Sequence, residues 1–479
     1  MFRSKLYLML NRREFTLSTG ASALLTPSFA ATTAPPLIDG VEFISATDQQ
    51  AERFTLGYAR AFDRIPRVRA LCSSADAVAK TLKWALNTGR TFAIRSGGHS
   101  FAGFSQHEDL VIDLRRMNSL RFEPTTGEVT VGAGALLGQV ARSMAQSNAT
   151  IPGGICATVG MAGHTLGGGI GYFGRRDGLL SDQLVSLRIV TASGELLHIA
   201  EDSHPDLFWA CRGGGTGNFG IVTDLTFRVQ RPQPMQWVRF TAPVEAIRAA
   251  EILFLWQHRT QTWPRDTVLH LRLAKQTGAS FLITLEGLSG WSGDDLASEL
   301  AILLRTTSDE VQRAIYPGTM SELIQRMMPS DAFIRADLLN HSHLYNGPMG
   351  ERATLDVLST LLDHPAGRVN LNIEPLGGAV ADKAPNATAF PHREASFAIQ
   401  SQVILRDTDN REALTASNEA MRGVLEAQAT GGVYANYPDL SLSDWGRKYW
   451  GNNLPRLKEI KARHDPETVF DHAHSIARA

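Results

Sequence analysis

Apolar positions follow two different spacings in the first part of the chain. Residues 75–87 (ADAVAKTLKWALN) repeat apolar side chains at helical spacing, with Asp76 near the start and Gly89 just beyond the end, which predicts a helix. Shorter apolar runs predict a strand within RVRALCSS at 67–74, before this helix, and strands at 91–94, 109–114 and 128–132. The order of strand, helix, strand and glycine loop is typical of an α/β arrangement.

The pattern of short elements continues as far as residue 232. We expect a helix at 138–146, a hairpin of strands at 184–190 and 195–199, a short helix at 206–210 and a strand at 221–229. The prolines of the segment RPQP at 231–234 then interrupt the pattern. This segment is therefore the best internal boundary.

Beyond this boundary, strands and helices follow one another without glycine-rich loops. Strands are expected at 268–273, 280–286, 370–376 and 395–405, and helices at 244–258, 294–304 and 408–428. This order suggests an antiparallel sheet covered by helices. We predict an α+β protein whose parts are a linker at 31–60 with Pro35 and Pro36, domains at 61–232 and 233–430, and a distinct segment at 431–479.

Composition and charge narrow the classes of function. With 479 residues, the chain is long enough for two or three domains. Its 47 basic and 48 acidic residues leave a net charge of -1, so no basic field is available for nucleic acid or an anionic membrane. The cysteines are Cys72, Cys156 and Cys211, an odd and sparse set that argues against a disulfide framework and lacks the spacing of a zinc site.

The N-terminus carries a pattern of its own. The segment NRREFTL at 11–17 places Arg12 and Arg13 before a modestly apolar run, and small residues follow at 28–30. We interpret residues 1–30 as a twin-arginine signal that exports the folded protein, periplasmic or secreted, through the export machinery. A frayed basic helix is the alternative. The apolar run is too short to be a permanent membrane anchor.

Two glycine-rich segments carry the candidate chemistry. RSGGHS at 95–100 offers successive backbone N–H groups unshielded by side chains, together with His99. The segment at 153–171 does the same around Cys156. Taken alone, His99 reads as a turn histidine, and Cys156 could be a nucleophile, although no supporting histidine pattern accompanies it.

Two further features of the sequence could suggest a function, but the evidence for each is weak. The chain contains GxGxxG at 169–174 and 215–220, but neither match follows a strand and opens a helix, so we reject a nicotinamide-binding Rossmann unit. His341, His343 and His364 lack a carboxylate or thiol that would complete a metal site, and we expect surface histidines and no metal.

The motifs, in their order along the chain, resemble one family. They are RSGGHSFAGFS, GGICATVGMAGHTLGGGIGYFGRRDGLLSDQ, DLFWACRGGGTGNFGIVT, YANYPDL and DWGRKYWGNNLPRLKEIKARHDPETVF. The chain after residue 60 is similar throughout to the berberine-bridge-enzyme-like family of FAD-linked oxidases, within the wider vanillyl-alcohol-oxidase (PCMH-type) flavoprotein fold. The resemblance implies a PCMH-type FAD-binding domain, completed by the C-terminal segment, and a substrate domain.

The resemblance also implies how FAD is held. His99 matches the histidine that bonds the 8α carbon of the flavin, and Cys156 matches the cysteine that bonds C6. Asn453 would close over the isoalloxazine ring, and Asp182, Ile221 and Val222 would line the adenine or dimethylbenzene side. The other expected cofactor-binding residues are Arg95, Ser96, Gly97, Gly98, Ser100, Thr158, Val159, Gly160, Gly163, His164, Gly220 and Asn436. The family usually has proline where Ala157 stands and often glycine where Ala162 stands, but neither change removes a reactive atom.

Three residues are implied in catalysis. Tyr437 matches the tyrosine that takes the substrate proton, Gln400 matches a strand position facing the flavin, and Tyr434 could share the work. Because a free tyrosine has a pKa of about 10, Tyr437 would need a pKa lowered by a cation or a hydrogen-bond network. A core tyrosine with a structural hydrogen bond is the alternative. Val159, at the position of the family's proposed oxygen gate, agrees with an oxidase.

The expected reaction is the oxidation of a CH–OH group of a carbohydrate, alcohol or secondary metabolite. A hydride would pass to flavin N5, and O2 would be reduced to H2O2. Alternatives are a flavin dehydrogenase of the same fold with another electron acceptor, an oxidative cyclisation, and a flavoprotein-derived binding module without catalysis. The expected partners are a small-molecule substrate and O2, with no nucleic acid and no stable membrane insertion.

Overall fold

The computed structural model describes residues 34–479, except 216, 232, 277, 331, 333–334 and 365–368. The chain divides into two compact units, Met1–Pro36 and Leu37–Ala479, and all of the described helices and strands belong to the second. The predicted signal at 1–30 lies outside the described residues. Among the described residues, no helix has the length and apolar character needed to cross a membrane.

A four-stranded sheet opens this second unit, in the order β1 (Val41–Ser45), β2 (Val68–Cys72), β4 (Leu110–Asp113) and β3 (Phe92–Arg95). Strands β2 and β3 run parallel to β4, and the helix α2 (Ala75–Asn87) connects β2 to β3. The side chain of Ser74 accepts a hydrogen bond from the N–H of Ala77 and caps α2. The predicted helix is confirmed. The prediction of a linker at 31–60 is wrong in part, because this segment contains β1 and the short helix α1 (Ala51–Thr55).

A five-stranded sheet follows, in the order β5 (Leu120–Glu123), β6 (Glu128–Gly132), β9 (Ile221–Arg228), β7 (Leu184–Val190) and β8 (Leu196–Ala200). The strands β7 and β8 pair antiparallel, which confirms the predicted hairpin. Four short helices lie between the strands in sequence: α3 (Leu137–Gln146), α4 (Met161–Leu166), α5 (Gly174–Asp177) and α6 (Pro205–Ala210). One apolar core joins both sheets to α2, α3 and α6.

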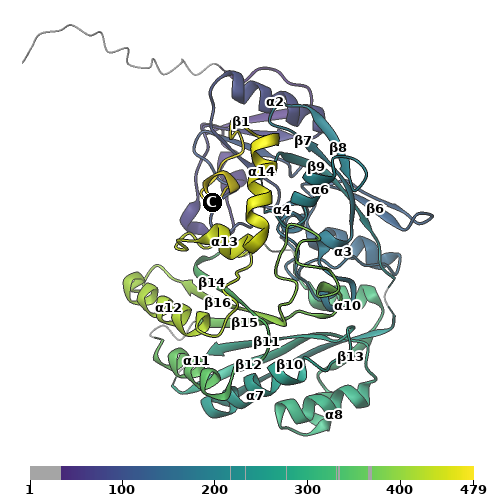
Figure 1. Ribbon diagram of the computed structural model, residues 1–479, viewed down its shortest axis with the longest axis vertical. Helices are drawn as coiled ribbons and strands as arrows, with labels where there is room; N and C mark the ends of the chain where they lie inside the picture. Colours follow the sequence, from purple (N-terminus) through teal and green to yellow (C-terminus); the bar gives the residue numbers. More distant parts are fainter. Residues whose placement is uncertain are drawn as a thin grey trace, which may run out of the picture. The chain divides into compact units, whose positions relative to one another are not determined.

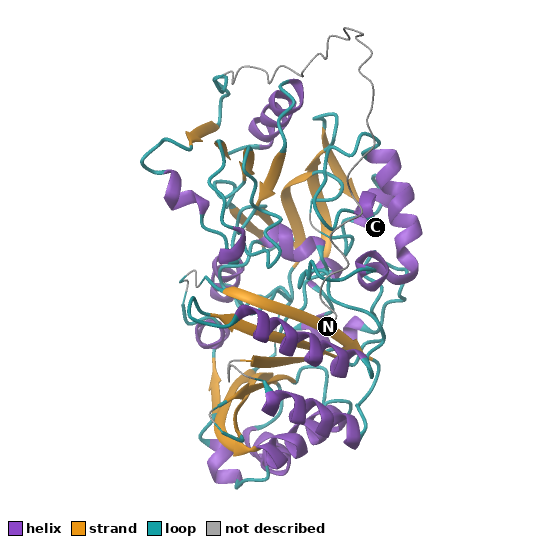
Figure 2. Cartoon of the chain, turned by 90° about the vertical axis from the view of Figure 1, so that its left-hand side faces the viewer, coloured by secondary structure: helices purple, strands orange, loops and turns teal. Residues whose placement is uncertain are grey.

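The second half is built on a seven-stranded antiparallel sheet. Its order is β13 (Ile315–Gly318), β10 (Met235–Glu245), β12 (Ser280–Ser289), β11 (Val268–Lys275), β15 (Val369–Pro375), β16 (Phe397–Leu405) and β14 (Asp337–Tyr345). The helices α7 (Ala246–Arg259), α8 (Gly293–Leu304), α11 (Glu351–Asp363) and α12 (Arg411–Glu426) cover one face (Figures 1 and 2). The smaller helices are α9 (Ser308–Gln312) and α10 (Met320–Met327).

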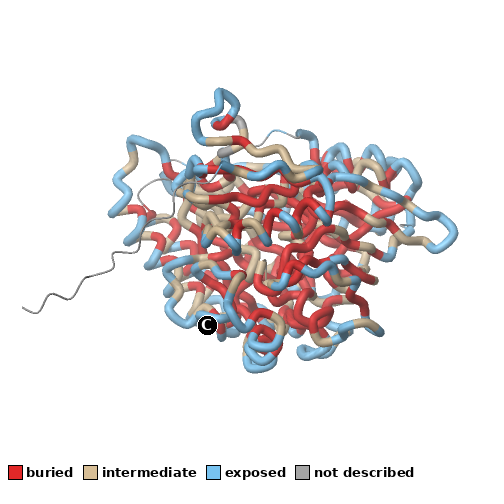
Figure 3. Tube along the Cα trace, turned by 90° about the horizontal axis from the view of Figure 1, so that it is seen from above, coloured by how far each residue is buried: buried red, intermediate tan, exposed pale blue. Residues whose placement is uncertain are grey.

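The two faces of this sheet differ because side chains alternate along each strand. Leu271, Ile373 and Ile399 lie in register on neighbouring strands and belong to the helix-covered core. The intervening positions, such as His270 and Glu374, carry polar side chains and face the other way. The sheet therefore presents a polar face toward the first half of the molecule. Figure 3 shows the buried segments that run through the middle of this unit.

The C-terminal segment returns to the first half of the molecule through α13 (Trp445–Trp450) and α14 (Leu454–His464) (Figure 1). The buried ammonium group of Lys461 donates to the carbonyl oxygens of Asn218 (2.6 Å) and Phe470 (2.7 Å) and pairs with Asp465 (2.6 Å). A charge at this depth needs such partners. The segment between α12 and α13, which carries Tyr437, is therefore held by α12 at one end and by the C-terminal helices α13 and α14 at the other.

Candidate functional site

A cavity of about 1100 Å³ lies against both glycine-rich segments. Its lining also includes residues of β11, of β15 and of the loop at 434–438, so the polar face of the large sheet forms part of the wall. This volume is slightly larger than the usual range of about 300–1,000 Å³ for ligand sites in proteins. The predicted site residues in the lining are Ser96, Gly97, Gly98, His99, Ser100, Cys156, Val159, Gly160, Gly163, His164, Gly220, Val222, Tyr434, Asn436 and Tyr437.

The two glycine-rich segments touch each other through their backbones. A Cβ atom on Gly97 would lie 2.4 Å from the backbone nitrogen of Gly160, and a Cβ on Gly160 would lie 2.3 Å from that of Gly97. Contacts this short require glycine at both positions. The sequence separates these residues by the strands β4, β5 and β6 and the helix α3, and the fold brings them together at the cavity.

His99 and Cys156 both line the cavity. Burial lowers the pKa of His99 to about 4, so its imidazole is neutral near pH 7. Burial, with a smaller contribution from Glu374, raises the pKa of the Cys156 thiol to about 11, although the side chain is accessible from within the cavity. Two nucleophilic side chains in their neutral forms thus face the same space.

His164 adds an unused polar atom to the same wall. Its Nε2 atom is buried and has no hydrogen-bond partner among the described residues. Burial lowers its pKa to about 4. A large ligand with polar groups fits a cavity of this kind, since an unpaired buried nitrogen costs about 1–3 kcal/mol until it is bonded. The open glycine backbones, the volume and the accessible His99 and Cys156 fit FAD.

Tyr437 meets a carboxyl group in the cavity. Its hydroxyl donates a hydrogen bond of 2.9 Å to Oε1 of Glu374, which projects from β15. Burial raises the pKa of Glu374 to about 7. Burial and then the proximity of Glu374 raise the pKa of Tyr437 well above its usual value. The lowered pKa that Tyr437 would need to act alone as a base is therefore not found, because the neighbouring group is an acid and not a cation.

Glu374 is a functional residue that sequence reasoning missed. Its Oε2 atom is buried without a hydrogen-bond partner in the described part of the chain. The signal was present within the strand predicted at 370–376, where a carboxylate stands among the alternating apolar residues of VNLNIEP. Its partner Tyr437 is 63 positions away, so only the fold could identify the pair.

His270 on β11 was missed as well. It lines the cavity, and its Nε2 atom is buried without a partner among the described residues. The ring of Tyr172 packs against it with centroids 4.4 Å apart. Burial lowers the pKa of His270 to about 3, so the imidazole is neutral at ordinary pH. The alternating sequence VLHLRL could have indicated that His270 lies on the polar face of the sheet.

Tyr434 lines the cavity but its hydroxyl oxygen is engaged by the protein. It accepts hydrogen bonds from the N–H groups of Gly169 (3.0 Å) and Ile170 (3.1 Å) and from the amide of Asn436 (2.9 Å). The same Asn436 amide donates to the carbonyl of His164. Burial raises the pKa of Tyr434 to about 12. This tyrosine fastens the C-terminal segment to the second glycine-rich segment.

Six of the predicted site residues lie off the cavity lining: Arg95, Thr158, Asp182, Ile221, Gln400 and Asn453. Asp182 forms a buried two-pronged ion pair with Arg393 at 2.6 and 2.8 Å. The amide of Asn453 donates to the carbonyls of Pro385 (2.8 Å) and Thr388 (3.1 Å). These two side chains join parts of the protein to each other, which corrects the expectation that they face the cofactor directly.

Gln400 reaches Tyr437 only through another residue. Its amide donates to Oδ1 of Asn340 at 2.6 Å, and the amide of Asn340 donates to the backbone carbonyl of Tyr437 at 3.3 Å. Gln400 therefore supports the loop that carries Tyr437. It lies on the polar face of the sheet, in register with Asn372, but outside the cavity lining, and its position toward the flavin stays a prediction.

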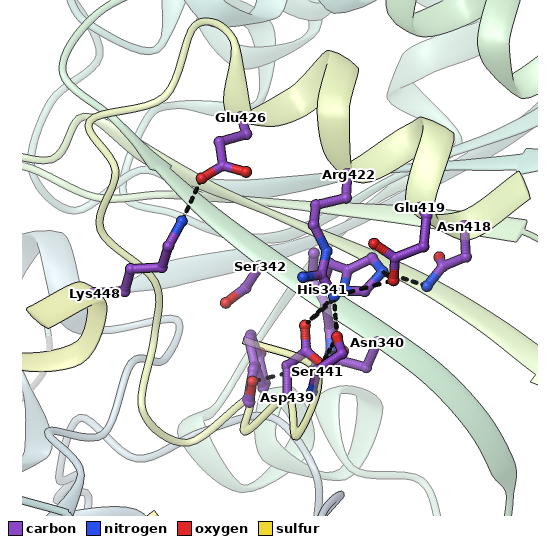
Figure 4. A network of polar contacts seen from close by, with 12 residues as sticks. Asn340, His341, Ser342, Asn418, Glu419, Arg422, Glu426, Asp439, Ser441 and Lys448 are labelled. Atoms are coloured by element: carbon purple, nitrogen blue, oxygen red, sulfur yellow. Dashed lines mark hydrogen bonds and ion pairs between the residues drawn. The ribbon is translucent and has the colours of Figure 1, made fainter. Parts of the chain in front are cut away.

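A polar network beside this loop includes His341 (Figure 4). Its Nδ1 atom lies 2.7 Å from Oδ2 of Asp439, and Arg422 on α12 contacts the same oxygen at 2.8 Å. His341 is buried in this network, and His343 and His364 are buried as well, which corrects the expectation that these three are surface histidines. In the described ranges, no cluster of three or more potential metal ligands occurs. The network holds the residues that follow Tyr437 against β14 and α12.

Comparison with known proteins agrees with this site. Residues 66–200 match the model of an FAD binding domain, and residues 433–477 match the berberine and berberine-like model. The FAD-linked oxidoreductase YgaK of Bacillus subtilis is 31% identical over 440 residues, covering 86% of this chain and 92% of the relative. The glucooligosaccharide oxidase of Sarocladium strictum is 26% identical, with 86% and 88% covered.

Solved structures show the same fold. A variant of the BBE-like 1 protein of Physcomitrella patens superposes with a TM-score of 0.84 at 23% identity, covering 92% of this chain and 97% of that one. A variant of berberine bridge enzyme gives a TM-score of 0.83 at 23% identity, with 92% and 97% covered. The predicted α+β fold is confirmed. The chain belongs to the berberine-bridge-enzyme-like family of FAD-linked oxidoreductases.

Proposed function

We propose that this enzyme is an oxidase that carries FAD on both His99 and Cys156 and oxidises a CH–OH group, with Tyr437 and Glu374 removing the hydroxyl proton. The observation that carries the proposal is the 2.9 Å hydrogen bond from Tyr437 to Glu374 in the cavity that also exposes His99 and Cys156. One cavity thus holds two attachment groups and a pair able to move a proton.

The attachment rests on the positions of two nucleophiles. A solved structure with the same fold, the glucooligosaccharide oxidase from Acremonium strictum, carries a 6-S-cysteinyl, 8α-N1-histidyl FAD. Burial keeps the imidazole of His99 neutral near pH 7, and neutral imidazole is the nucleophilic form of histidine. Bound FAD supplies the two-electron acceptor, which O2 reoxidises with formation of H2O2.

The proton path follows from the hydrogen bond. Tyr437 cannot act as a phenolate near pH 7, because its pKa lies above the usual value. Glu374, with a pKa of about 7, is partly ionised at that pH and accepts the tyrosine proton. As Tyr437 gives its proton to Glu374, it takes the proton of the substrate hydroxyl. The charge left on the substrate oxygen drives the hydride from the adjacent carbon.

The unpartnered atoms indicate the character of the substrate. Nε2 of His270 and Oε2 of Glu374 are buried on the same polar face and have no partner in the described part of the protein. Buried polar atoms of this kind select a substrate that bonds them. This favours a substrate with several hydroxyl groups, such as a carbohydrate or a hydroxylated secondary metabolite. Relatives named glucooligosaccharide oxidase and aclacinomycin oxidase support both classes.

Peroxide formation tests the proposal. We would incubate the purified protein in air with glucose, cellobiose, lactose and benzyl alcohol and measure H2O2, and we would follow anaerobic bleaching of the flavin with the same compounds. We expect both signals with at least one polyhydroxy compound and a large loss of bleaching rate in Tyr437→Phe. Bleaching without peroxide would indicate a dehydrogenase, and an unchanged rate in Tyr437→Phe would exclude the role of this tyrosine.

We also propose export through the twin-arginine route. The support is the sequence pattern around Arg12 and Arg13 alone. Replacing both arginines by lysine should retain the protein inside the cells, while the unchanged protein should appear in the exported fraction. Equal export of the two forms would contradict this proposal.

A further inference from the structure

Tyr58 lies against the histidine that we expect to carry FAD. The rings of Tyr58 and His99 are stacked, with centroids 4.0 Å apart and planes inclined by 19°. His99 lines the cavity and Tyr58 does not. Tyr58 therefore packs against the imidazole from outside the cavity lining.

The backbone around Tyr58 is fixed by contacts from three directions. The N–H of Tyr58 donates to the carbonyl of Gly98 at 2.9 Å, and the carbonyl of Tyr58 accepts from the N–H of Ala336 at 2.9 Å. Arg95 donates to the carbonyl of Leu56 at 2.8 Å. Residues 56–58 thus form a strap between the first glycine-rich segment and the chain that leads into β14.

The ring of Tyr58 also has neighbours at its hydroxyl and at its edge. The side chain of Gln402, on β16, lies near the Tyr58 hydroxyl, and burial raises the pKa of Tyr58 to about 12, so the phenol stays neutral. Phe101 packs beside the same ring, with centroids 5.3 Å apart. With its backbone held and its edge packed, this ring offers His99 a flat surface in one orientation.

We propose that Tyr58 is a positioning residue for the covalent attachment of FAD at His99. This inference rests on the proposed function. Attachment replaces an imidazole N–H and a C–H of the flavin 8α-methyl group by one N–C bond, and the two electrons and two protons released end on O2 as H2O2. The imidazole must present its nitrogen toward that carbon, and stacking on Tyr58 fixes the ring plane before the bond forms. Loss of such alignment costs about 10²-fold in rate.

Site-resolved flavin attachment tests the proposal. In full-length Cys156→Ala protein, where His99 is the remaining attachment site, we would compare Tyr58→Leu with the matched variant Tyr58→Phe. Each protein is incubated with excess FAD in air, and flavin that stays with acid-precipitated protein is followed with time. We expect attachment to slow about 10²-fold in Tyr58→Leu and to stay near the parent rate in Tyr58→Phe, which keeps the stacked ring.

A second measurement separates positioning from a general loosening of the cavity. With Cys156 intact, peptide mass spectrometry of Tyr58→Leu should show FAD on Cys156 and little on His99. Unchanged attachment at His99, loss of FAD from both sites, or equal defects in Tyr58→Leu and Tyr58→Phe would each overturn the role of stacking. Absence of acid-stable flavin from the unmodified protein would contradict the proposed attachment itself.

Discussion

The two sides of the cavity differ in the groups that they expose. The glycine side, formed by residues 96–100 and 154–164, offers mainly backbone and the side chains of His99, Cys156 and His164. The sheet side, formed by His270, Glu374 and the adjacent Tyr437, offers titratable side chains on strands and on an anchored loop. One side is shaped to hold a large cofactor, and the other to move protons.

The two sides also depend on the rest of the protein in different ways. Gly97 and Gly160 work through the absence of a side chain, so their requirement is steric and local. On the sheet side, unpartnered atoms of His270 and Glu374 are buried, at a cost of about 1–3 kcal/mol each. A substrate can recover that free energy, which makes the sheet side selective as well as reactive.

The largest effect is expected from a substitution that removes the proton acceptor on the sheet side. Glu374→Gln removes the proton acceptor for Tyr437 while keeping its size, and anaerobic flavin reduction should slow by about 10²–10⁴-fold. Stopped-flow absorbance measures this rate, and the FAD content serves as the control because the glycine side is untouched. A normal reduction rate in a fully loaded variant would show that Glu374 has no part in the chemistry.

The next largest effect is expected from a substitution that disturbs the packing of the two glycine-rich segments. Gly160→Ala places a Cβ 2.3 Å from the backbone nitrogen of Gly97, so the two segments must separate. We expect loss of most of the bound FAD, and a rate lower by about 10²-fold in any molecules that retain it. Flavin absorbance per protein measures the loading. Gly423→Ala is the matched control, since among the described residues no atom beyond the adjoining backbone of its own helix lies within 4 Å of a Cβ there. Equal loading of the unmodified protein, Gly160→Ala and Gly423→Ala would refute the steric argument.

The same contrast explains what the sequence could predict. Helix α2 was predicted with its observed bounds because its signals are local. Strand β14 was not, because Asn340, His341 and His343 make its sequence polar and its place depends on pairing with β16. On the glycine side, His99 and Cys156 stand in recognisable motifs. On the sheet side, Glu374 acts through a residue 63 positions away, and Asp182 is paired with Arg393 at a separation of 211.

The pH dependence of the reaction is a smaller effect that tests whether Glu374 is the base on the sheet side. Because Glu374 must be deprotonated to accept the proton, and burial raises its pKa to about 7, the flavin reduction rate should rise with pH and level off above about pH 7. Well below pH 7, the flavin reduction rate should rise about tenfold for each pH unit. A pH series of anaerobic reduction measures it. This rise of the reduction rate with pH should disappear in Glu374→Gln. If the rise persisted in that variant, the titrating group would be another residue.

The smallest effect on rate comes from the tyrosine that joins the two sides. Tyr434→Phe removes the oxygen that accepts hydrogen bonds from Gly169, Ile170 and Asn436, and leaves these donors buried. We expect the flavin reduction rate to stay close to that of the unmodified protein and the free energy of unfolding to fall by about 1–3 kcal/mol. Denaturant unfolding and stopped-flow reduction measure the two quantities. Tyr437→Phe should give the opposite result, with a slow reaction and a smaller change in stability. If Tyr434→Phe slowed the reaction as much as Tyr437→Phe, both hydroxyls would belong to the proton path, and the division between a structural and a reactive tyrosine would fail.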